Sequence, residues 1–250
     1  MIELKTESEI EKMRVANRIV SRTLDLVGEN LKPGITTEEL DRLASDFIRS
    51  NGAEPAFLGY HNYPKSICVS IDDEVVHGIP SPDRVICEGQ LVSVDIGSYI
   101  GGFNGDSARS FFIGTASTET QKLLDTTKKA LENGIDRARV GNRLGDISHA
   151  VQETAENAGF SVVRDLVGHG IGRQMHEEPQ VPNYGKTGTG IELKAGMTIA
   201  IEPMVNAGDW RVRTKPDRWT IVTADGSLSA HFEHTIVITE NGPVILSKSD

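Results

Sequence analysis

Cysteine is scarce in this sequence, and long hydrophobic stretches are absent. The chain of 250 residues has two cysteines, Cys68 and Cys87, and no Cys-x-x-Cys motif, so neither a disulfide framework nor a zinc site is indicated. No window approaches the roughly 18 apolar residues of a membrane span. The first residues, MIELKTESEIEKM, lack the basic start and apolar run of a signal peptide. These absences predict a cytosolic chain with two reduced thiols and no membrane partner.

Positive charge is also scarce. Lysine and arginine total 26 against 36 acidic residues, which gives a formal net charge of −10, and the pI is about 5.2. This balance argues against a broad nucleic-acid surface. No Pro/Ser-rich linker interrupts the chain, and a composition of 38% hydrophobic and 25% charged residues is that of an ordinary globular protein. We therefore expect a monomer with one domain over residues 1–250, whose parts share one core.

Four helices are predicted from capping signals followed by apolar residues at helical spacing. Short alternating segments at residues 66–71 and 231–238 predict strands between and after them. Together they indicate an α+β fold with mainly antiparallel strands. The signals that bound the helices are Ser8-x-x-Glu11 to Pro33-Gly34, Thr36-x-x-Glu39 to Asn51-Gly52, Thr118-x-x-Gln121 to Gly141, and Gly141 to Gly159.

Residues of the second half repeat those of the first at a constant offset of 107 positions. Such a period is too long for a solenoid. We interpret it as a duplicated α/β half, spanning about residues 1–110 and 111–250, with the copies related by a pseudo-two-fold axis. The matched features are Gly34 and Gly141, Gly52 and Gly159, Leu24 and Leu131, and the strand-like segments 89–95 and 196–202.

Four carboxylates lie in or beside predicted strands. Asp95 and Glu202 end the two matched strands, Glu233 lies inside an alternating strand, and Asp106 follows Asn-Gly. A carboxylate in a strand is costly to bury unless it is paired or bound to metal. If the duplication brings the halves together on the axis, the four charges converge, and two divalent cations would balance them. His169, between two glycines, would supply a nitrogen ligand.

Each of these residues also has an ordinary interpretation. A single carboxylate is more often a surface or capping residue, although the symmetric placement favours the metal site. A single histidine is more often packed or exposed than catalytic. The same reservation applies to the other residues that stand out, which are the histidines His77 and His176, the aromatics Tyr60, Tyr63 and Trp219, and the basic run 211–215.

Eight motifs with regular spacing run through most of the chain. They are Gly59-Tyr-His-Asn-Tyr-Pro-Lys-Ser-Ile-Cys68, Glu74-Val-Val-His77-Gly-Ile-Pro80, Val94-Asp95-Ile-Gly, Gly105-Asp106-Ser, Gly168-His169-Gly-Ile-Gly, Met175-His176-Glu-Glu-Pro-Gln-Val, Thr198-Ile-Ala-Ile-Glu202-Pro-Met-Val-Asn-Ala-Gly and Ser229-Ala-His-Phe-Glu233-His-Thr. Together they resemble the type-one methionine aminopeptidases, which have the pita-bread fold. The resemblance implies that fold and the removal of N-terminal methionine before a small second residue. The interval of 31 residues between Glu202 and Glu233 leaves no room for the insertion of type-two enzymes, so the chain resembles the short bacterial form.

The resemblance also implies the roles of individual residues. The implied metal ligands are Asp95, Asp106, His169, Glu202 and Glu233. Asp106 and Glu233 would bridge two ions, and the oxygen-rich set suits cobalt, manganese or iron(II), with zinc as a further option. In the implied mechanism a metal-activated hydroxide attacks the scissile carbonyl, and Glu202 is the general base.

Further positions of the family motif would contact the substrate. By resemblance, His176 would donate a hydrogen bond to the developing oxyanion, and His77 would lie near the scissile amide nitrogen. Phe57 stands where many relatives have cysteine, and Met175 where phenylalanine is common. The residues implied around the methionine side chain are Phe57, Tyr60, Tyr63, Cys68, Met175 and Trp219.

Two other functions stay open at this point. Proline-specific aminopeptidases and dipeptidases share the fold, but they carry an additional N-terminal domain for which 250 residues leave no room. A non-catalytic pita-bread module that only binds peptide would have lost its ligands, and all five are present here. The expected partner is the N-terminus of a nascent polypeptide, with a transient contact to the ribosome.

Overall fold

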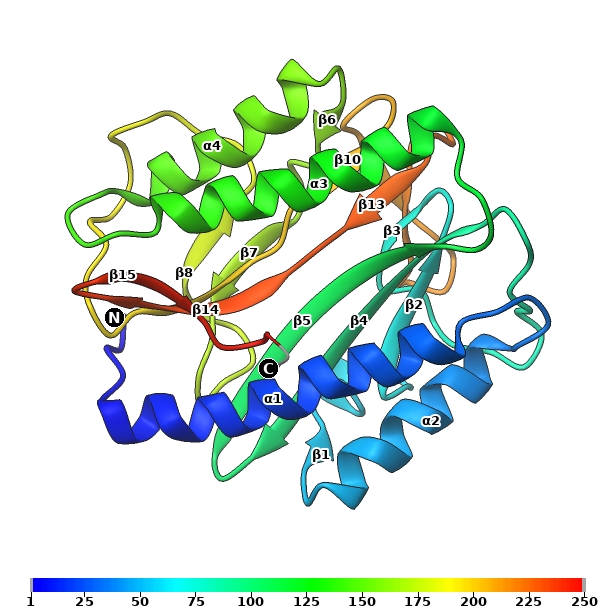
Figure 1. Ribbon diagram of the computed structural model, residues 1–250, viewed down its shortest axis with the longest axis horizontal. Coiled ribbons are helices and arrows are strands. Elements are labelled where there is room, and N and C mark those ends of the chain that lie inside the picture. The colour runs from blue at the N-terminus through cyan, green and yellow to red at the C-terminus, as the bar shows by residue number, and fades with distance from the viewer. Residues whose placement is uncertain (1, 249–250) are drawn as a thin grey trace.

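The computed structural model describes residues 2–248, in which four long helices pack beside antiparallel strands (Figure 1). The helices are α1 (Glu7–Asn30), α2 (Thr37–Ser50), the short 3-10 helix η1 (Tyr60–Asn62), α3 (Thr118–Arg137) and α4 (Leu144–Asn157). The strands are β1 (Glu54–Pro55), β2 (Ile67–Ile71), β3 (Glu74–Val76), β4 (Leu91–Ile100), β5 (Phe103–Phe112), β6 (Ser161–Val162), β7 (Val167–Gly170), β8 (Glu177–Pro182), β9 (Thr198–Ile201), β10 (Met204–Asn206), β11 (Val212–Thr214), β12 (Ile221–Thr223), β13 (Ser229–His231), β14 (His234–Thr239) and β15 (Gly242–Ile245).

The first helix begins earlier than its sequence signal indicates. The side chain of Thr6 accepts a hydrogen bond from the backbone N–H of Glu9, and the Glu9 carboxylate accepts the backbone N–H of Thr6 at 2.8 Å. This is a capping box, so the prediction of Ser8 and Glu11 for that role is wrong. Thr6 has the extended backbone that a cap requires, whereas Ser8 is already helical.

The other helix starts agree more closely with prediction. Thr36 and Glu39 form the expected capping box of α2, with N–H···O distances of 2.8 and 3.1 Å. In α3 the cap is Ser117, one residue before the predicted Thr118, because its hydroxyl accepts the backbone N–H of Thr120 at 3.1 Å.

No helix within residues 2–248 is long and apolar enough to cross a bilayer.

The offset of 107 positions has a direct structural counterpart. Helices α2 and α4 both have 14 residues and begin 107 positions apart. Two isolated antiparallel bridges, Thr36 to Val85 and Arg143 to Glu192, repeat at the same offset. The repeated glycines all have positive φ, which only glycine adopts without strain, so backbone shape explains why they recur. These glycines are Gly34 and Gly141, Gly52 and Gly159, and Gly89 and Gly196.

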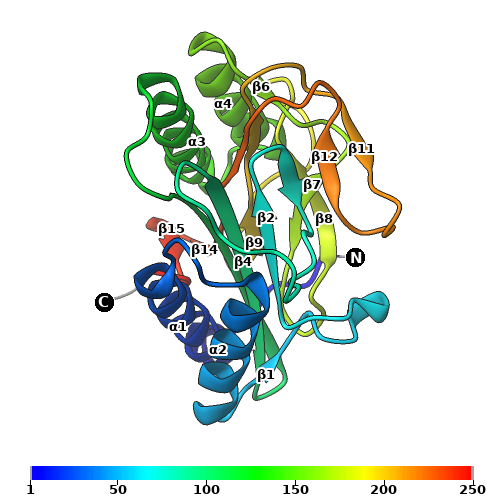
Figure 2. The ribbon, with the colours of Figure 1, turned by 90° about the vertical axis from the view of Figure 1, so that its right-hand side faces the viewer.

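Within residues 2–248 the strands form four antiparallel sheets, in agreement with the α+β prediction. Their orders are β1-β4-β2 with β5 paired to β4, β15-β14-β9-β7-β8, β13-β10-β6 and β11-β12-β3. The four long helices lie on one side of the strands, and β11 and β12 lie on the opposite side (Figure 2). The pair α1 and α2 belongs to the first half and α3 and α4 to the second, so the helical layer is duplicated along with the strands (Figure 1).

The apolar core is divided rather than single. One large cluster lies in the first half and includes Leu24, Leu40 and Val94. The other lies mainly in the second half and includes Leu131 and Ile199. Two smaller clusters contain residues of both halves, such as Met13 with Val237 and Val76 with Met204. Leu91 of the first half also lies in the second-half cluster, so apolar packing within residues 2–248 connects the two halves.

Two strands differ from their predicted extents. Strand β4 continues to Ile100, because β5 pairs with it up to that residue on one side and β1 pairs with Ser98 and Tyr99 on the other. Asp95 therefore lies in the interior of the strand instead of at its end. A turn at Gly101 and Gly102 then leads into β5. The predicted strand 231–238 is broken, because β13 ends at His231 and β14 begins at His234.

Candidate metal centre

The predicted site residues surround one cavity of about 180 Å³. It takes side chains from both halves of the chain, and its lining includes every residue predicted for the site except Met175. His61 is an additional lining residue. The full lining is Phe57, Tyr60, His61, Tyr63, Cys68, His77, Asp95, Asp106, His169, His176, Glu202, Trp219 and Glu233.

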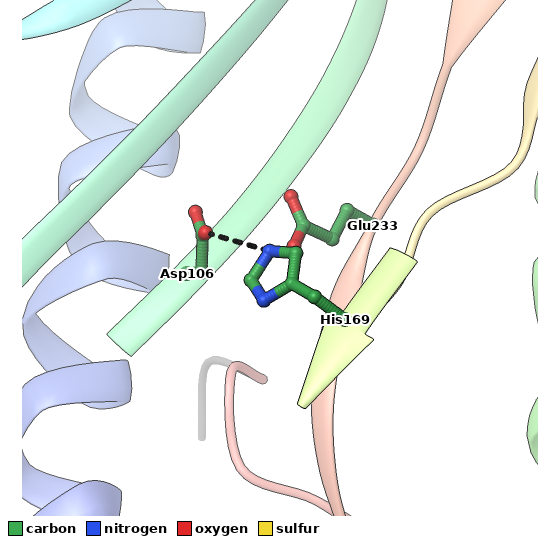
Figure 3. Close-up of side chains that lie close together, drawn as sticks. All are labelled: Asp106, His169 and Glu233. Carbon is green, nitrogen blue, oxygen red and sulfur yellow. Dashed lines mark ion pairs between the residues drawn. The ribbon is translucent and has the colours of Figure 1, made fainter. Parts of the chain in front are cut away.

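Five different segments supply the candidate ligands. Asp95 comes from β4 and Asp106 from β5, where Asp106 pairs with Gly97. His169 comes from β7, Glu202 directly follows β9, and Glu233 occupies the break between β13 and β14. One ligand atom each from Asp106, His169 and Glu233 lies within 4.8 Å of the others, and Figure 3 shows these three side chains pointing toward one another.

His169 is oriented by its own backbone neighbour. Its Nδ1 lies 2.9 Å from the carbonyl oxygen of Gly170, so Nδ1 carries the hydrogen and donates it. Its Nε2 then presents a lone pair to the carboxylates, 3.8 Å from Asp106 Oδ2 and 3.5 Å from Glu202 Oε1. A neutral imidazole held in this way is the usual form of a histidine that binds metal.

Hydrogen bonds to β5 hold the broken segment around Glu233 in place. Ser107 Oγ donates to the Glu233 carbonyl at 2.6 Å, and the Glu233 N–H donates to the Ala108 carbonyl at 2.9 Å. Thr235 Oγ1 donates to the Asp106 carbonyl at 2.8 Å. These bonds cross from the second half to the first, and they bring Glu233 beside Asp106.

The electrostatics of the cavity favour bound cations. Burial raises the pKa of all four carboxyls, and the neighbouring carboxylates raise those of Asp106, Glu202 and Glu233 further; the pKa of Asp95 is about 7. Three buried oxygens, Asp95 Oδ1, Asp106 Oδ1 and Glu233 Oε1, have no hydrogen-bond partner among residues 2–248. Buried polar atoms are rarely left so. Oxygen ligands without partners, crowded by like charge, fit divalent metal ions.

Burial lowers the pKa of three histidines that line the cavity, so their rings are neutral. Burial lowers the pKa of His169 to about 3 and that of His77 to about 4, with His176 contributing to both. His77 also has a positive φ of 60°, an uncommon backbone for a residue other than glycine. Tyr60 OH lies 2.6 Å from His176 Nδ1, so the other ring nitrogen of His176 is available to the cavity.

The apolar wall contains most of the predicted pocket residues. Tyr63 is buried, its hydroxyl lies 3.1 Å from the carbonyl oxygens of both Ile67 and Gly78, either of which can accept its single hydrogen, and its ring packs edge-on against Trp219. Burial raises the pKa of the Cys68 thiol well above its usual value, so this thiol is protonated. Cys68 and Cys87 are both free, as predicted.

Met175 is not among the residues that line the cavity. It is 4% exposed and packs with Phe57 and Tyr60. Both Met175 and Phe57 contact the backbone of Gly97, because a Cβ added there would lie 2.5 Å from Phe57 Cε1 and 2.9 Å from Met175 Cε. Met175 therefore lies beside Phe57, a residue of the cavity lining, and its predicted place around the methionine side chain stays a prediction.

Two residues of the site were not singled out in the sequence. His61 lines the cavity from η1 with a φ of 47°. His231 is buried, with Nε2 4.0 Å from Glu202 Oε2, and burial lowers its pKa to about 3. Both occur inside the quoted motifs. The signal for His231 was its position two residues before Glu233, which puts the two side chains on the same face of an extended segment.

Comparisons with known proteins identify the family. A model of metallopeptidase family M24 matches residues 11–240. The chain is 53% identical over 247 residues to a methionine aminopeptidase of Clostridium acetobutylicum, covering 99% of both proteins. It is 50% identical over 248 residues to methionine aminopeptidase 1 of Bacillus subtilis, covering 99% of this chain and 100% of that protein.

Solved structures agree with this assignment. The crystal structure of methionine aminopeptidase from Thermotoga maritima matches with a TM-score of 0.98 and 49% identity over 100% of both chains. The prolidase from Pyrococcus horikoshii matches at 22% identity with a TM-score of 0.79, covering 99% of this chain and 64% of the prolidase. That likeness shows the shared pita-bread fold alone. The family and the buried Asp/His/Glu cluster together indicate that divalent metal binds here, and the chain belongs to metallopeptidase family M24, among its methionine aminopeptidases.

Proposed function

We propose that this protein removes N-terminal methionine from nascent polypeptides with the help of two divalent metal ions. The single observation that carries the proposal is the convergence of five potential ligands on one cavity, where three of their oxygens are buried without a hydrogen-bond partner in the described part of the chain. The relatives named methionine aminopeptidase, at 53% and 50% identity over nearly the full length, support the same reaction.

The residues around the cavity fit two ions better than one. Asp95, Asp106, His169, Glu202 and Glu233 would hold the ions, with Asp106 and Glu233 serving both. One ligand atom each from Asp106, His169 and Glu233 lies within 4.8 Å of the others. This ligand set suits cobalt, manganese, iron(II) or zinc. Bound there, such ions polarise a carbonyl group and lower the pKa of water.

The protein's own groups would then hold the substrate and move its protons. Glu202 has a raised pKa and faces the cavity, so it would accept a proton from the attacking water and pass it on to the leaving amine. His176, oriented through its Nδ1 by Tyr60, would donate from its other nitrogen to the developing oxyanion. His77 would contact the scissile amide nitrogen, where a neutral ring can donate or accept a hydrogen bond.

Selectivity would come from the two ends of the cavity. The free α-amine would lie beside Asp95, which would restrict cleavage to chain ends. The methionine side chain would occupy the apolar side, against Phe57, Tyr63 and Trp219. A cavity of about 180 Å³ would also favour a small second residue.

We further propose that the enzyme acts as a monomer in the cytoplasm, in transient contact with the ribosome, where such substrates arise.

A proline-specific aminopeptidase or dipeptidase is the alternative from the same fold. A panel of peptides separates the candidates: Met-Gly-Met-Met, the same peptide with an acetylated N-terminus, Gly-Pro-Met and the dipeptide Met-Pro. Methionine release from the free tetrapeptide alone supports the proposal. Cleavage beside proline would favour the alternative, and release from the acetylated peptide would contradict the role given to the free amine. Binding without any cleavage would indicate a peptide-binding module.

A further inference from the structure

His231 is a buried histidine that faces one of the proposed ligands from behind. It is 2% exposed, and its Nε2 lies 4.0 Å from Glu202 Oε2. This nitrogen is buried and has no hydrogen-bond partner among residues 2–248. An imidazole nitrogen in this state is unusual, because desolvation without a partner is costly. Its position therefore calls for a functional explanation.

The backbone of His231 is fixed tightly to the first half of the chain. Its N–H donates to Ser110 Oγ at 2.9 Å, and the same hydroxyl donates to the His231 carbonyl at 2.8 Å. Ser93 Oγ lies 2.7 Å from Ser110 Oγ and must be the donor there, because Ser110 has only one hydrogen to give. His231 also pairs with Met204 across β13 and β10. The direction of the ring is thus set by strands from both halves.

Glu202 lies between two imidazole rings. His169 Nε2 lies 3.5 Å from Oε1, and His231 Nε2 lies 4.0 Å from Oε2. His169 lines the cavity, but His231 does not. His231 therefore has access to the carboxylate of Glu202 without access to a substrate in the cavity.

We propose that His231 is a positioning residue for Glu202, whose Oε2 accepts a hydrogen bond from the Nε2–H of His231. The inference rests on the proposed function, in which Glu202 both binds metal and moves a proton. A carboxylate offers only lone pairs, so the tautomer with hydrogen on Nε2 is the one that attracts it. The observed 4.0 Å is about 1 Å longer than an ordinary N–H···O bond, and a small movement of the Glu202 side chain closes it. Held this way, one carboxylate oxygen is kept in place while the other stays directed at the metal site.

Substitutions at His231 separate positioning from packing. His231→Leu fills the space but cannot donate, whereas the amide of His231→Gln can donate from nearly the position of Nε2. The leucine variant is expected to lower kcat about 10- to 100-fold and to weaken metal binding over a similar range, with KM changed by less than about twofold. The glutamine variant should restore most of both. His149→Leu, on α4 and outside the cavity lining, is the matched control and should leave both unchanged.

Two measurements that need no turnover test the positioning role of His231 separately from the proposed peptidase activity. Metal affinity is read by calorimetry, which needs no turnover. The tautomer of His231 is read by nitrogen-15 NMR of the zinc-loaded wild-type protein, and we expect hydrogen on Nε2. Wild-type kcat in His231→Leu, equal losses in the leucine and glutamine variants, or hydrogen on Nδ1 alone would each overturn the positioning role. If the wild-type protein cleaves no methionine peptide with any of the four metals, the proposed function fails, while the NMR result still decides the hydrogen bond.

Discussion

Glu202 is the residue on which the proposed chemistry depends most directly. It borders the cavity, lies 3.5 Å from His169 Nε2, and has a pKa raised first by burial and then by Asp106 and Asp95. We expect Glu202→Gln to lower kcat about 10²- to 10⁴-fold, since the amide cannot accept the proton. The metal-free variant should fold at least as stably as the wild type, because one of four repelling carboxyls is gone. Steady-state kinetics with thermal melting as control tests this, and a kcat near the wild-type value would remove Glu202 from the mechanism.

Phe57 and Met175 should act together on the methionine pocket. Both contact the backbone of Gly97, so a change in one alters the space available to the other. Phe57→Cys should leave a void and weaken discrimination against longer side chains such as ethionine, and Met175→Phe should overcrowd the pocket, each at about 1–3 kcal/mol in kcat/KM. The double variant should recover methionine preference by roughly 0.5–3 kcal/mol beyond the additive value. Strict additivity would show that the two residues do not share this space.

Single residues also show where sequence reasoning ends. The carboxylates, His77 and His169 were predicted because the motifs fix their identity, and the structure brings them to one cavity. Met175 packs in one cluster with Phe57, and a motif does not tell which of two apolar neighbours meets the substrate. His231 was quoted without a role, because its meaning depends on a distance to Glu202 that spans the fold.

At the scale of elements, hydroxyl bonds from β5 replace a regular strand pairing around Glu233. We expect Ser107→Ala to destabilise the protein by about 1–3 kcal/mol, because the buried Glu233 carbonyl loses its donor. Metal affinity should fall as well, since the loosened segment carries a proposed ligand. Ser148→Ala in α4, where the hydroxyl bonds Leu144 within the helix, is the control and should cost stability only. Calorimetry and chemical unfolding give the two values, and unchanged metal affinity in Ser107→Ala would contradict this account of the segment.

The sequence predicted which segments form helices and strands more accurately than it predicted the residues at which they begin and end. The helices and their order follow from periodicity and capping signals, but Thr6 rather than Ser8 caps α1, because two overlapping patterns satisfied the same rule. The strand through Asp95 continues to Ile100, since pairing partners on both sides outweigh the local signal. The break at Glu233 arises from hydrogen bonds to a strand over 100 positions earlier, which no local pattern encodes.

For the whole molecule, charged residues of both halves meet at one cavity, and this makes metal binding depend on pH. The folded pKa values of the four carboxyls are raised, that of Asp95 to about 7, so the metal-free protein holds protons there that metal must displace. Metal affinity should therefore rise as pH increases through about 6 to 8, and binding should release protons. Calorimetry in buffers of different ionisation enthalpy measures the released protons, and a heat independent of buffer would contradict this linkage.

The stability of the metal-free protein should depend on pH as well. The stability that these carboxyls contribute is present below their pKa values in the unfolded chain, and it is lost as pH rises through their higher pKa values in the folded protein.

The central claim is that this cavity cleaves an N-terminal methionyl bond only when divalent metal occupies it. The most direct measurement is the rate of methionine release from Met-Gly-Met-Met by protein that is stripped with a chelator, verified as metal-free by elemental analysis, and then titrated with manganese or cobalt. We predict that the rate falls to background in the stripped protein, returns on addition of metal and saturates near two ions per chain, as expected for a two-metal site. An undiminished rate in the verified metal-free protein would contradict the claim.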